Sequence, residues 1–286
     1  MARSTLAATR AWGCSPAVTP ARIVAARAAP SPRLSSRRAG PVHRAHSAAT
    51  TASPPLHFEE VILTNSRTTD MAHALWRAVL REGDVAVDAT AGNGWDTLTL
   101  AELVLGDDDA DPRRGGRVVA FDVQAPALDA TRARLDAALS PARASRVQLV
   151  LASHADMERH VLPGDGDRGD GDLGDGDGVG VVCFNLGYLP GVGSDKSVVT
   201  LPESTLEAAR AAIRLLRPGG VLTIVGYTGH DGGREEVDAV MRLVSELDPR
   251  EYTATTHAIV NRDNCPQLIA VHRKTTQTKG NGKTPR

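Results

Sequence analysis

The chain has 286 residues, of which 41% are hydrophobic and 23% are charged, an ordinary composition for a globular protein with a full core. No apolar run approaches the roughly 20 residues that a membrane helix needs, so we expect no association with a membrane. Cys14, Cys183 and Cys265 form no CxxC pair and have no zinc-type spacing, which argues against a metal site and a disulfide framework.

Residues 1–58 differ in kind from the rest of the chain. They contain no Asp or Glu, but eight arginines stand among Ala, Ser, Thr and Pro. This composition is typical of an organellar transit peptide, and the Ser, Thr and Pro content favours a chloroplast over a mitochondrion. A disordered basic tail that stays attached is the alternative. We therefore expect a folded domain over residues 59–274 and a disordered basic tail over 275–286.

The charge of the folded part decides nothing about an RNA partner. The whole chain has a formal charge of −1, and without the eight N-terminal arginines 25 basic residues face 34 acidic ones. Ten of these acids lie in two Asp-rich inserts, 106–116 and 164–178, so the remaining body is about neutral. The second insert offers no register with the ligand positions of a helix-loop-helix calcium loop. We expect both inserts to be flexible and solvated.

Strands and helices are predicted to alternate from residue 68 onward. The sequence predicts helices over 70–80, 95–105, 125–139, 204–216 and 234–247, a short segment over 154–161, and strands over 85–90, 117–123, 147–152, 181–186, 221–227, 252–260 and 267–273. Such alternation indicates a parallel sheet with helices on both faces, and the short turn over 261–266 indicates a final antiparallel pair. This layout resembles the α/β, Rossmann-like three-layer sandwich of class I methyltransferases, with a seven-stranded, mostly parallel sheet and a C-terminal antiparallel hairpin.

The first expected strand ends in DATAGNGWDT, residues 88–97. Gly92 and Gly94 allow the backbone to turn tightly and approach a ligand, and the first amides of the next helix point to the same place. A Gly-rich turn serves dinucleotides as well as S-adenosylmethionine. Asp88 favours S-adenosylmethionine, because an acid repels phosphates and suits a cationic methionyl group. A dinucleotide, in contrast, needs a GxGxxG turn.

The next two strand ends carry polar side chains for the same ligand. Asp122 ends the second strand, where a carboxylate accepts hydrogen bonds from both ribose hydroxyls. The third strand ends in LASHAD, which places Ser153 and His154 near the adenine. A capping or solvated role for His154 stays open.

The fourth strand ends in FNLGYLPG, residues 184–191. Amine-directed methyltransferases have an Asn or Asp here, then two small or proline residues, then an aromatic. The amide oxygen of Asn185, with a strand-end carbonyl, can hold the N–H groups of an amine so that its lone pair faces the methyl group. Tyr188 then packs against the substrate. In the alternative interpretation, Asn185 only caps the turn.

The chain resembles the bacterial and organellar family of putative rRNA methylases over roughly residues 60–273, in motifs that occur in this order: DATAGNG with DT, FDxQ, FNLGYLPG, SVVTLPEST, LLRPGG, IVGYTGHDGG and NRDNCP. Members are implicated in methylating the 5-aminomethyl group of 2-thiouridine at the tRNA wobble position. The resemblance thus implies an S-adenosylmethionine-dependent N-methyltransferase with an RNA substrate. The chain departs from the family where Trp95 replaces a His and where YHGH becomes YTGH at Tyr227–His230.

The residues and the resemblance together give the candidate sites. The expected cofactor-binding residues are Asp88, Thr90, Gly92, Asn93, Gly94, Asp96, Thr97, Asp122, Gln124, Ser153, His154, Asn185 and Leu186. The expected catalytic residues are Asn185, Tyr188 and His230, and the expected substrate-binding residues are Tyr188, Pro190, Tyr227 and His230. His230 and His154 are the candidate acceptors of the proton that an alkylammonium must lose, with bulk water as the alternative.

Other functions stay open at this stage. Methylation of ribosomal RNA or of a small-molecule amine would use the same chemistry. A nucleoside- or RNA-binding module without turnover would not need all of Asp88, Gly92, Gly94, Asp122 and Asn185, and a dehydrogenase would need a pyrophosphate turn that is missing. The sequence leaves the RNA substrate and the oligomeric state open, a homodimer included.

Overall fold

The computed structural model describes residues 68–106, 116–161, 178–187, 200 and 202–275. All of them belong to one compact unit, Pro54–Arg286. The expected transit peptide, nearly all of both Asp-rich inserts and residues 276–286 lie outside the described residues.

The helices and strands alternate as the sequence predicts. The helices are α2 (Thr68–Val79), α3 (Trp95–Val104), α4 (Ala125–Ala138), α5 (Pro141–Ala144), α6 (Met157–Val161), α7 (Pro202–Leu215) and α8 (Gly233–Ser245), and a 3₁₀ turn, η1, covers His154–Asp156. The strands are β1 (Val85–Asp88), β2 (Arg117–Asp122), β3 (Val147–Leu151), β4 (Val179–Asn185), β5 (Leu216–Gly226), β6 (Tyr252–His257) and β7 (Gln267–Arg273). The short α5 was not predicted, although Ser140 caps it and Pro141 begins it, a pair that is typical of a helix start.

The described strands form one seven-stranded sheet in the order β3-β2-β1-β4-β5-β7-β6. Strands β1 to β5 pair in parallel, and β7 is antiparallel to both β5 and β6. The expected mostly parallel sheet with an antiparallel C-terminal pair is therefore confirmed. The order reverses between β1 and β4, which is where doubly wound sheets bind their ligands.

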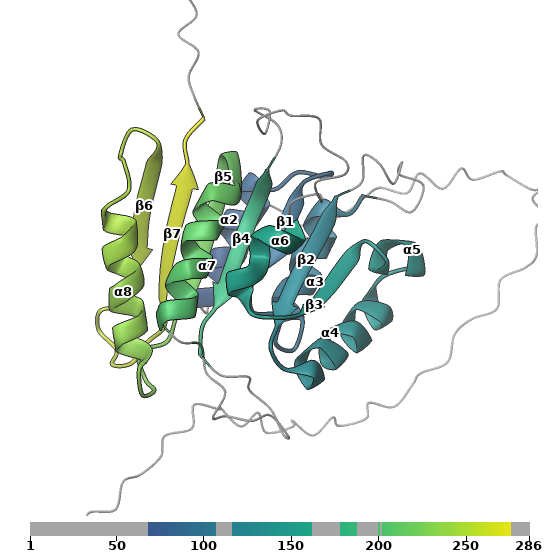
Figure 1. Ribbon diagram of the computed structural model, residues 1–286, viewed down its shortest axis with the longest axis horizontal. Coiled ribbons are helices and arrows are strands. Elements are labelled where there is room, and N and C mark those ends of the chain that lie inside the picture. Colours follow the sequence, from purple (N-terminus) through teal and green to yellow (C-terminus); the bar gives the residue numbers. More distant parts are fainter. Residues whose placement is uncertain (1–67, 107–115, 162–177, 188–199, 201, 276–286) are drawn as a thin grey trace, which may run out of the picture. The chain divides into compact units, whose positions relative to one another are not determined.

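Helices cover both faces of this sheet and make three layers (Figure 1). On one face α6, α7 and α8 pack over strand residues such as Phe121, Phe184 and Ile224. On the other face α2, α3 and α4 pack over residues such as Val118, Val181 and Val225. Because the central strands are apolar on both faces, they read as continuous hydrophobic runs in the sequence.

Strand β5 begins earlier than the sequence predicts. The expected strand started at Val221, but pairing with β4 already begins at Leu216, and the register then shifts, since Val179 faces Leu216 while Val181 faces Val221. Pro218 and Gly219 lie in this bulge, and Gly219 has a φ of +78°. A Pro-Gly pair usually marks a turn, so a strand that continues across it is not expected from the residues alone.

Candidate active site

Asp88 is a buried carboxyl group at the carboxyl edge of the sheet. It is 1% exposed at the end of β1, and its carboxylate accepts hydrogen bonds from the Thr90 backbone N–H at 3.1 Å and the Thr97 hydroxyl at 2.6 Å. Burial, and next the charge of Asp96, raise the pKa of Asp88 to about 7 despite these two bonds, and the charge of Asp122 adds to the rise. The edge therefore holds more negative charge than the protein itself neutralises.

The glycine turn joins β1 to α3 as expected. Gly92 and Gly94 have φ values of +53° and +77°, a region that favours glycine. A Cβ on Gly94 would lie 2.8 Å from the Thr131 backbone on α4, so this glycine is also required for close packing. The Gly92 N–H donates to Asp122 Oδ2 at 3.0 Å, which ties the turn to the end of β2.

Asp122 ends β2 and is partly exposed. Besides Gly92, the Gln124 backbone N–H donates to its Oδ1 at 2.8 Å, so each oxygen keeps one lone-pair position for a ligand hydroxyl. Val123 beside it is 57% exposed, and Leu151 at the end of β3 is 59% exposed. Exposed apolar side chains on two neighbouring strand ends suit the flat face of a base.

Ser153 and His154 follow β3. Ser153 caps η1 through a bond from the Ala155 N–H to its hydroxyl. His154 is 9% exposed, its Nδ1 lies 3.3 Å from the Ala89 carbonyl, and its ring packs edge-on against Phe184. Burial lowers the pKa of His154, so the ring is neutral, and its buried Nε2 has no hydrogen-bond partner among the described residues.

Asn185 lies at the end of β4, one strand from Asp88. Its backbone N–H donates to the Thr90 hydroxyl at 2.7 Å, and its side-chain Nδ2 lies 3.4 Å from Asp96 Oδ2. Thr90 and Asp96, both expected at the cofactor, thus hold the strand end that carries Asn185. Leu186 is buried in the core and its N–H donates to the Val225 carbonyl, while Thr97 is fully buried beneath Asp88.

The segment after β5 meets the turn after β4. A Cβ on Gly187 would lie 3.6 Å from His230 Nε2 and 3.9 Å from the Tyr227 ring, so these two expected substrate residues lie beside the Asn185 turn. The His230 Nδ1 is 3.0 Å from the Asp231 carbonyl. Tyr188 and Pro190, which the sequence assigns to the same place, lie outside the described residues.

Asn93 and Trp95 lie on the outer side of the glycine turn. The Asn93 carbonyl accepts a bond from Arg134 Nε at 2.7 Å, and the Arg134 guanidinium stacks 3.3 Å above the Trp95 ring. Trp95 is 63% exposed. The residue that replaces the family's His is therefore packed on an arginine of α4.

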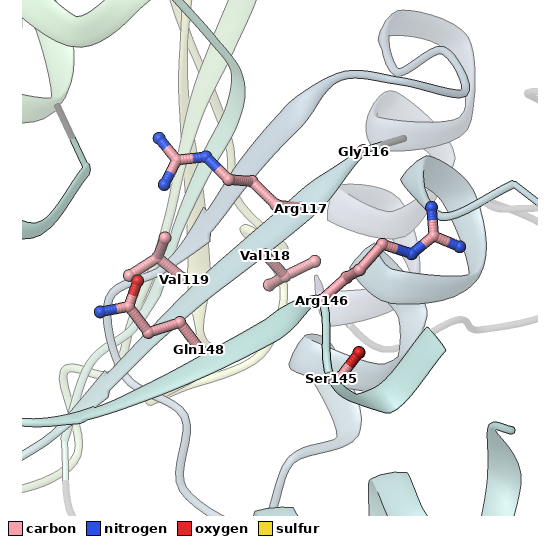
Figure 2. A pocket seen from close by; sticks show the side chains of 7 residues that line it. All are labelled: Gly116, Arg117, Val118, Val119, Ser145, Arg146 and Gln148. Atoms are coloured by element: carbon pink, nitrogen blue, oxygen red, sulfur yellow. The ribbon is translucent and has the colours of Figure 1, made fainter. Parts of the chain in front are cut away.

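A hollow of about 250 Å³ lies at the opposite edge, where β2 and β3 begin; Figure 2 shows the side chains that line it. Arg117 and Arg146 extend from it in different directions, and their guanidinium groups donate to the carbonyls of Val161 and Gly106. Its polar groups do not converge on one point, so it does not compete with the carboxyl edge as the active site.

In the described part of the chain, no group of three or more His, Cys, Asp or Glu side chains gathers in a way that could hold a metal ion. None of the described helices is long and apolar enough to cross a membrane.

The residues at the carboxyl edge fit S-adenosylmethionine. Burial is the largest cause of the raised pKa of Asp88, but the charges of Asp96 and Asp122 also raise it, and three neighbouring carboxyl groups make this edge favourable for the ligand's ammonium and sulfonium. Asp122 has acceptor positions for a ribose diol, and Val123 with Leu151 offers apolar contact to adenine. The buried, unpartnered His154 Nε2 supplies an acceptor at the same edge.

Known proteins agree with this geometry. A putative rRNA-methylase of Clostridium thermocellum matches with 32% identity and a TM-score of 0.61 over 73% of this chain and 98% of its own. A putative methyltransferase of Streptococcus mutans, solved in complex with SAH, matches with 31% identity and a TM-score of 0.57 over the same shares. The fold and its strand-end acids are those of a class I methyltransferase, the class that uses S-adenosylmethionine.

The family follows from two further matches. The family model described as "Putative rRNA methylase" matches residues 118–273. The chloroplastic tRNA (mnm(5)s(2)U34)-methyltransferase of Arabidopsis thaliana is 35% identical over 217 residues, which are 76% of this chain and 73% of that relative. The chain belongs to the putative rRNA methylase family, as its motifs indicate.

Sequence reasoning missed several residues that build this site. Val123 and Leu151 had a usable signal, because each is an apolar residue at a strand end next to expected site residues. Thr200 and His73 had none, since each reaches the site only after distant elements have packed together. Glu236, the partner of Thr200, was also missed.

Proposed function

We propose that the protein methylates the amine of 5-aminomethyl-2-thiouridine at the wobble position of tRNA. The observation that carries this proposal is Asn185, a partly buried amide at the end of β4, held by Thr90 and Asp96 beside the cofactor edge. The Arabidopsis relative, whose name specifies a methyltransferase for that wobble uridine, supports the same substrate.

Bound S-adenosylmethionine would supply an electrophilic methyl group, so that the amine nitrogen forms a bond to the methyl carbon as the carbon–sulfur bond breaks. The chain's own residues then have three tasks. Asp88 and Asp122 bind and orient the cofactor, Asn185 holds the amine in line, and one group accepts the proton that the nitrogen loses.

For the proton acceptor we propose His230. Of the two histidines that the sequence offers, His154 is buried and its pKa is lowered, so protonation there is unfavourable. His230 lies beside Gly187 and is less deeply embedded in the core. Tyr227 and Tyr188 are proposed to contact the uracil ring, one after β5 and one after β4.

The test is methyl transfer by the purified protein. The RNA substrates are tRNA bearing 5-aminomethyl-2-thiouridine, the same tRNA with an unmodified uridine, and ribosomal RNA, each mixed with labelled S-adenosylmethionine. We expect label only in the first and a mass increase of one methyl group in the modified nucleoside. Label in ribosomal RNA alone would favour the activity in the family's description instead.

For the cellular location we propose an organelle, and the chloroplast in particular. Residues 1–58 have the composition of a transit peptide, and the Arabidopsis relative is chloroplastic. A fusion of residues 1–58 to a fluorescent protein should enter chloroplasts of plant cells, and a fusion without them should not. If the fusion enters mitochondria instead, the chloroplast is the wrong organelle and the mitochondrion takes its place.

A further inference from the structure

His73 lies on α2, before the first strand, and no motif marks it. Its Nε2 is 2.7 Å from Asp96 Oδ1, and the side chains of the pair are only 18% and 16% exposed. Its ring packs on Trp76 at 4.6 Å between centroids, and the Trp76 indole donates to Thr223 on β5. The imidazole is therefore fixed by a helix that is itself anchored on the sheet.

Asp96 uses both of its carboxylate oxygens on protein groups. Oδ1 faces His73, and Oδ2 lies 3.4 Å from the Asn185 side-chain Nδ2. An ionised carboxylate only accepts hydrogen bonds, so it must face the NH₂ of the Asn185 amide and not its oxygen. The amide oxygen of Asn185 is then turned away from Asp96. Side chains from α2, α3 and β4 thus form a series of polar contacts that runs from His73 through Asp96 to Asn185.

We propose that His73 and Asp96 are positioning residues that fix the orientation of the Asn185 amide, so that its oxygen is presented to the attacking amine. This inference rests on the proposed function, because only an amine needs an acceptor for its N–H groups at that point. An amide free to rotate would offer its NH₂ to the amine part of the time, and an NH₂ cannot hold a lone-pair donor in line.

The geometry explains why a pair is needed. The bond from Asn185 to Asp96 is long, so Asp96 must itself be held in place for this bond to select one amide orientation. His73 does this from the other oxygen with a short bond. A displacement of about 1 Å at a reacting group can cost about 10²-fold in rate, so the effect of His73 is measurable although it never contacts the substrate.

The experiment is single-turnover methyl transfer to tRNA bearing 5-aminomethyl-2-thiouridine, at saturating cofactor and RNA. We expect His73→Ala to lower the rate about 10- to 100-fold while the affinity for S-adenosylmethionine and the melting temperature stay near the wild-type values. His73→Gln should recover most of the rate, because an amide N–H can replace the imidazole donor. Arg77→Ala, an exposed change on the same helix, is the matched control and should transfer at the wild-type rate.

The decisive measurement is a double mutant. If His73 acts through Asn185, then His73→Ala combined with Asn185→Ala should be no slower than Asn185→Ala alone. Rate losses that multiply would overturn the inference, and so would a wild-type rate for His73→Ala. If the wild-type protein itself fails to methylate this tRNA, the proposed function fails and the inference falls with it. Methyl transfer by the wild-type protein distinguishes that outcome from the two that concern His73 alone.

Discussion

Asp88 is a carboxyl group whose charge depends on what binds beside it. In the unliganded protein, burial and the charge of Asp96 raise its pKa to about 7, so it is partly protonated at neutral pH. A cationic ligand at the same edge reverses this preference, because an opposite charge favours the ionised form. Cofactor binding should therefore release protons, and it should strengthen as the pH rises through 7.

The same group makes the stability of the unliganded protein depend on pH. Since the pKa is higher in the folded state than the ordinary value of 3.8 for an aspartate, the folded state binds the proton more tightly, and stability falls as the pH rises from about 4 to about 7. Asp88 should contribute roughly 4 kcal/mol to this fall. Asp88→Asn should remove this contribution. The check is the free energy of unfolding, measured by urea denaturation at several pH values between about 4 and about 8.

Asp96→Asn is the control for this prediction. It removes the second-largest cause of the raised pKa of Asp88. The fall of its unfolding free energy with pH should therefore be smaller than in the wild type and larger than in Asp88→Asn. Equal slopes for all three proteins would mean that Asp88 is ionised in the fold.

Asn185 is the residue on which the proposed chemistry depends. Because it positions the amine in the transition state, Asn185→Ala should lower single-turnover methyl transfer by about 10² to 10³ while the affinity for S-adenosylmethionine stays nearly unchanged. Asn185→Asp should also be slow, since a second carboxylate would then face Asp96 and would hold the amine as an unreactive ammonium. Wild-type turnover by Asn185→Ala would reduce Asn185 to a strand cap.

At the scale of elements, α8 is tied to the turn after β4 by one buried acid. Glu236 is 2% exposed, and its carboxylate accepts bonds from the hydroxyls of Thr200 at 2.9 Å and Thr205 at 2.6 Å. The Thr200 hydroxyl in turn accepts a bond from the Gly187 N–H at 3.1 Å. The position of Gly187 beside His230 therefore depends on α8, through Thr200 and Glu236.

Glu236→Ala should lower the free energy of unfolding by about 2–4 kcal/mol, because it leaves the buried Thr205 hydroxyl and the partly buried Thr200 hydroxyl without their acceptor and opens a cavity. It should also slow methyl transfer through the loosened Gly187 turn. Asp238→Ala, an exposed change on the same helix, should alter stability by less than about 0.5 kcal/mol. Equal losses from the two variants, measured by urea denaturation, would contradict a role for the buried carboxylate.

Particular elements show how far the sequence could predict this fold and site. The strand ends with Asp88, Asp122 and Asn185 were found because apolar runs that stop at a polar residue place it at the carboxyl edge. Glu236 had a signal that went unused: it lies on the apolar stripe of α8 with Val237, Val240 and Val244, where an acid needs buried partners. The link from His73 to Asp96 could not be predicted, since it depends on how α2 docks against α3.

At the scale of the whole molecule, the role of the Asp-rich insert after α6 stays a prediction from the sequence, because residues 162–177 lie outside the described residues. We propose that residues 165–177 contribute nothing to the fold, because Asp and Gly in alternation bury little apolar surface. Replacing them with four Gly and Ser residues should leave the melting temperature and the affinity for S-adenosylmethionine unchanged. A cooperative loss of stability, or a melting temperature that rises with calcium only in the intact protein, would show that the insert is structured.

The strand order has a consequence for how the chain is made. β5 lies in the middle of the sheet, but its neighbour on one side is β7, Gln267–Arg273, which leaves the ribosome after every other strand. Until β7 is available, β5 presents an open, apolar edge that can pair with another chain. The nascent domain therefore stays incompletely folded until β7 has been made, and during that time the open edge of β5 is a site at which aggregation can begin.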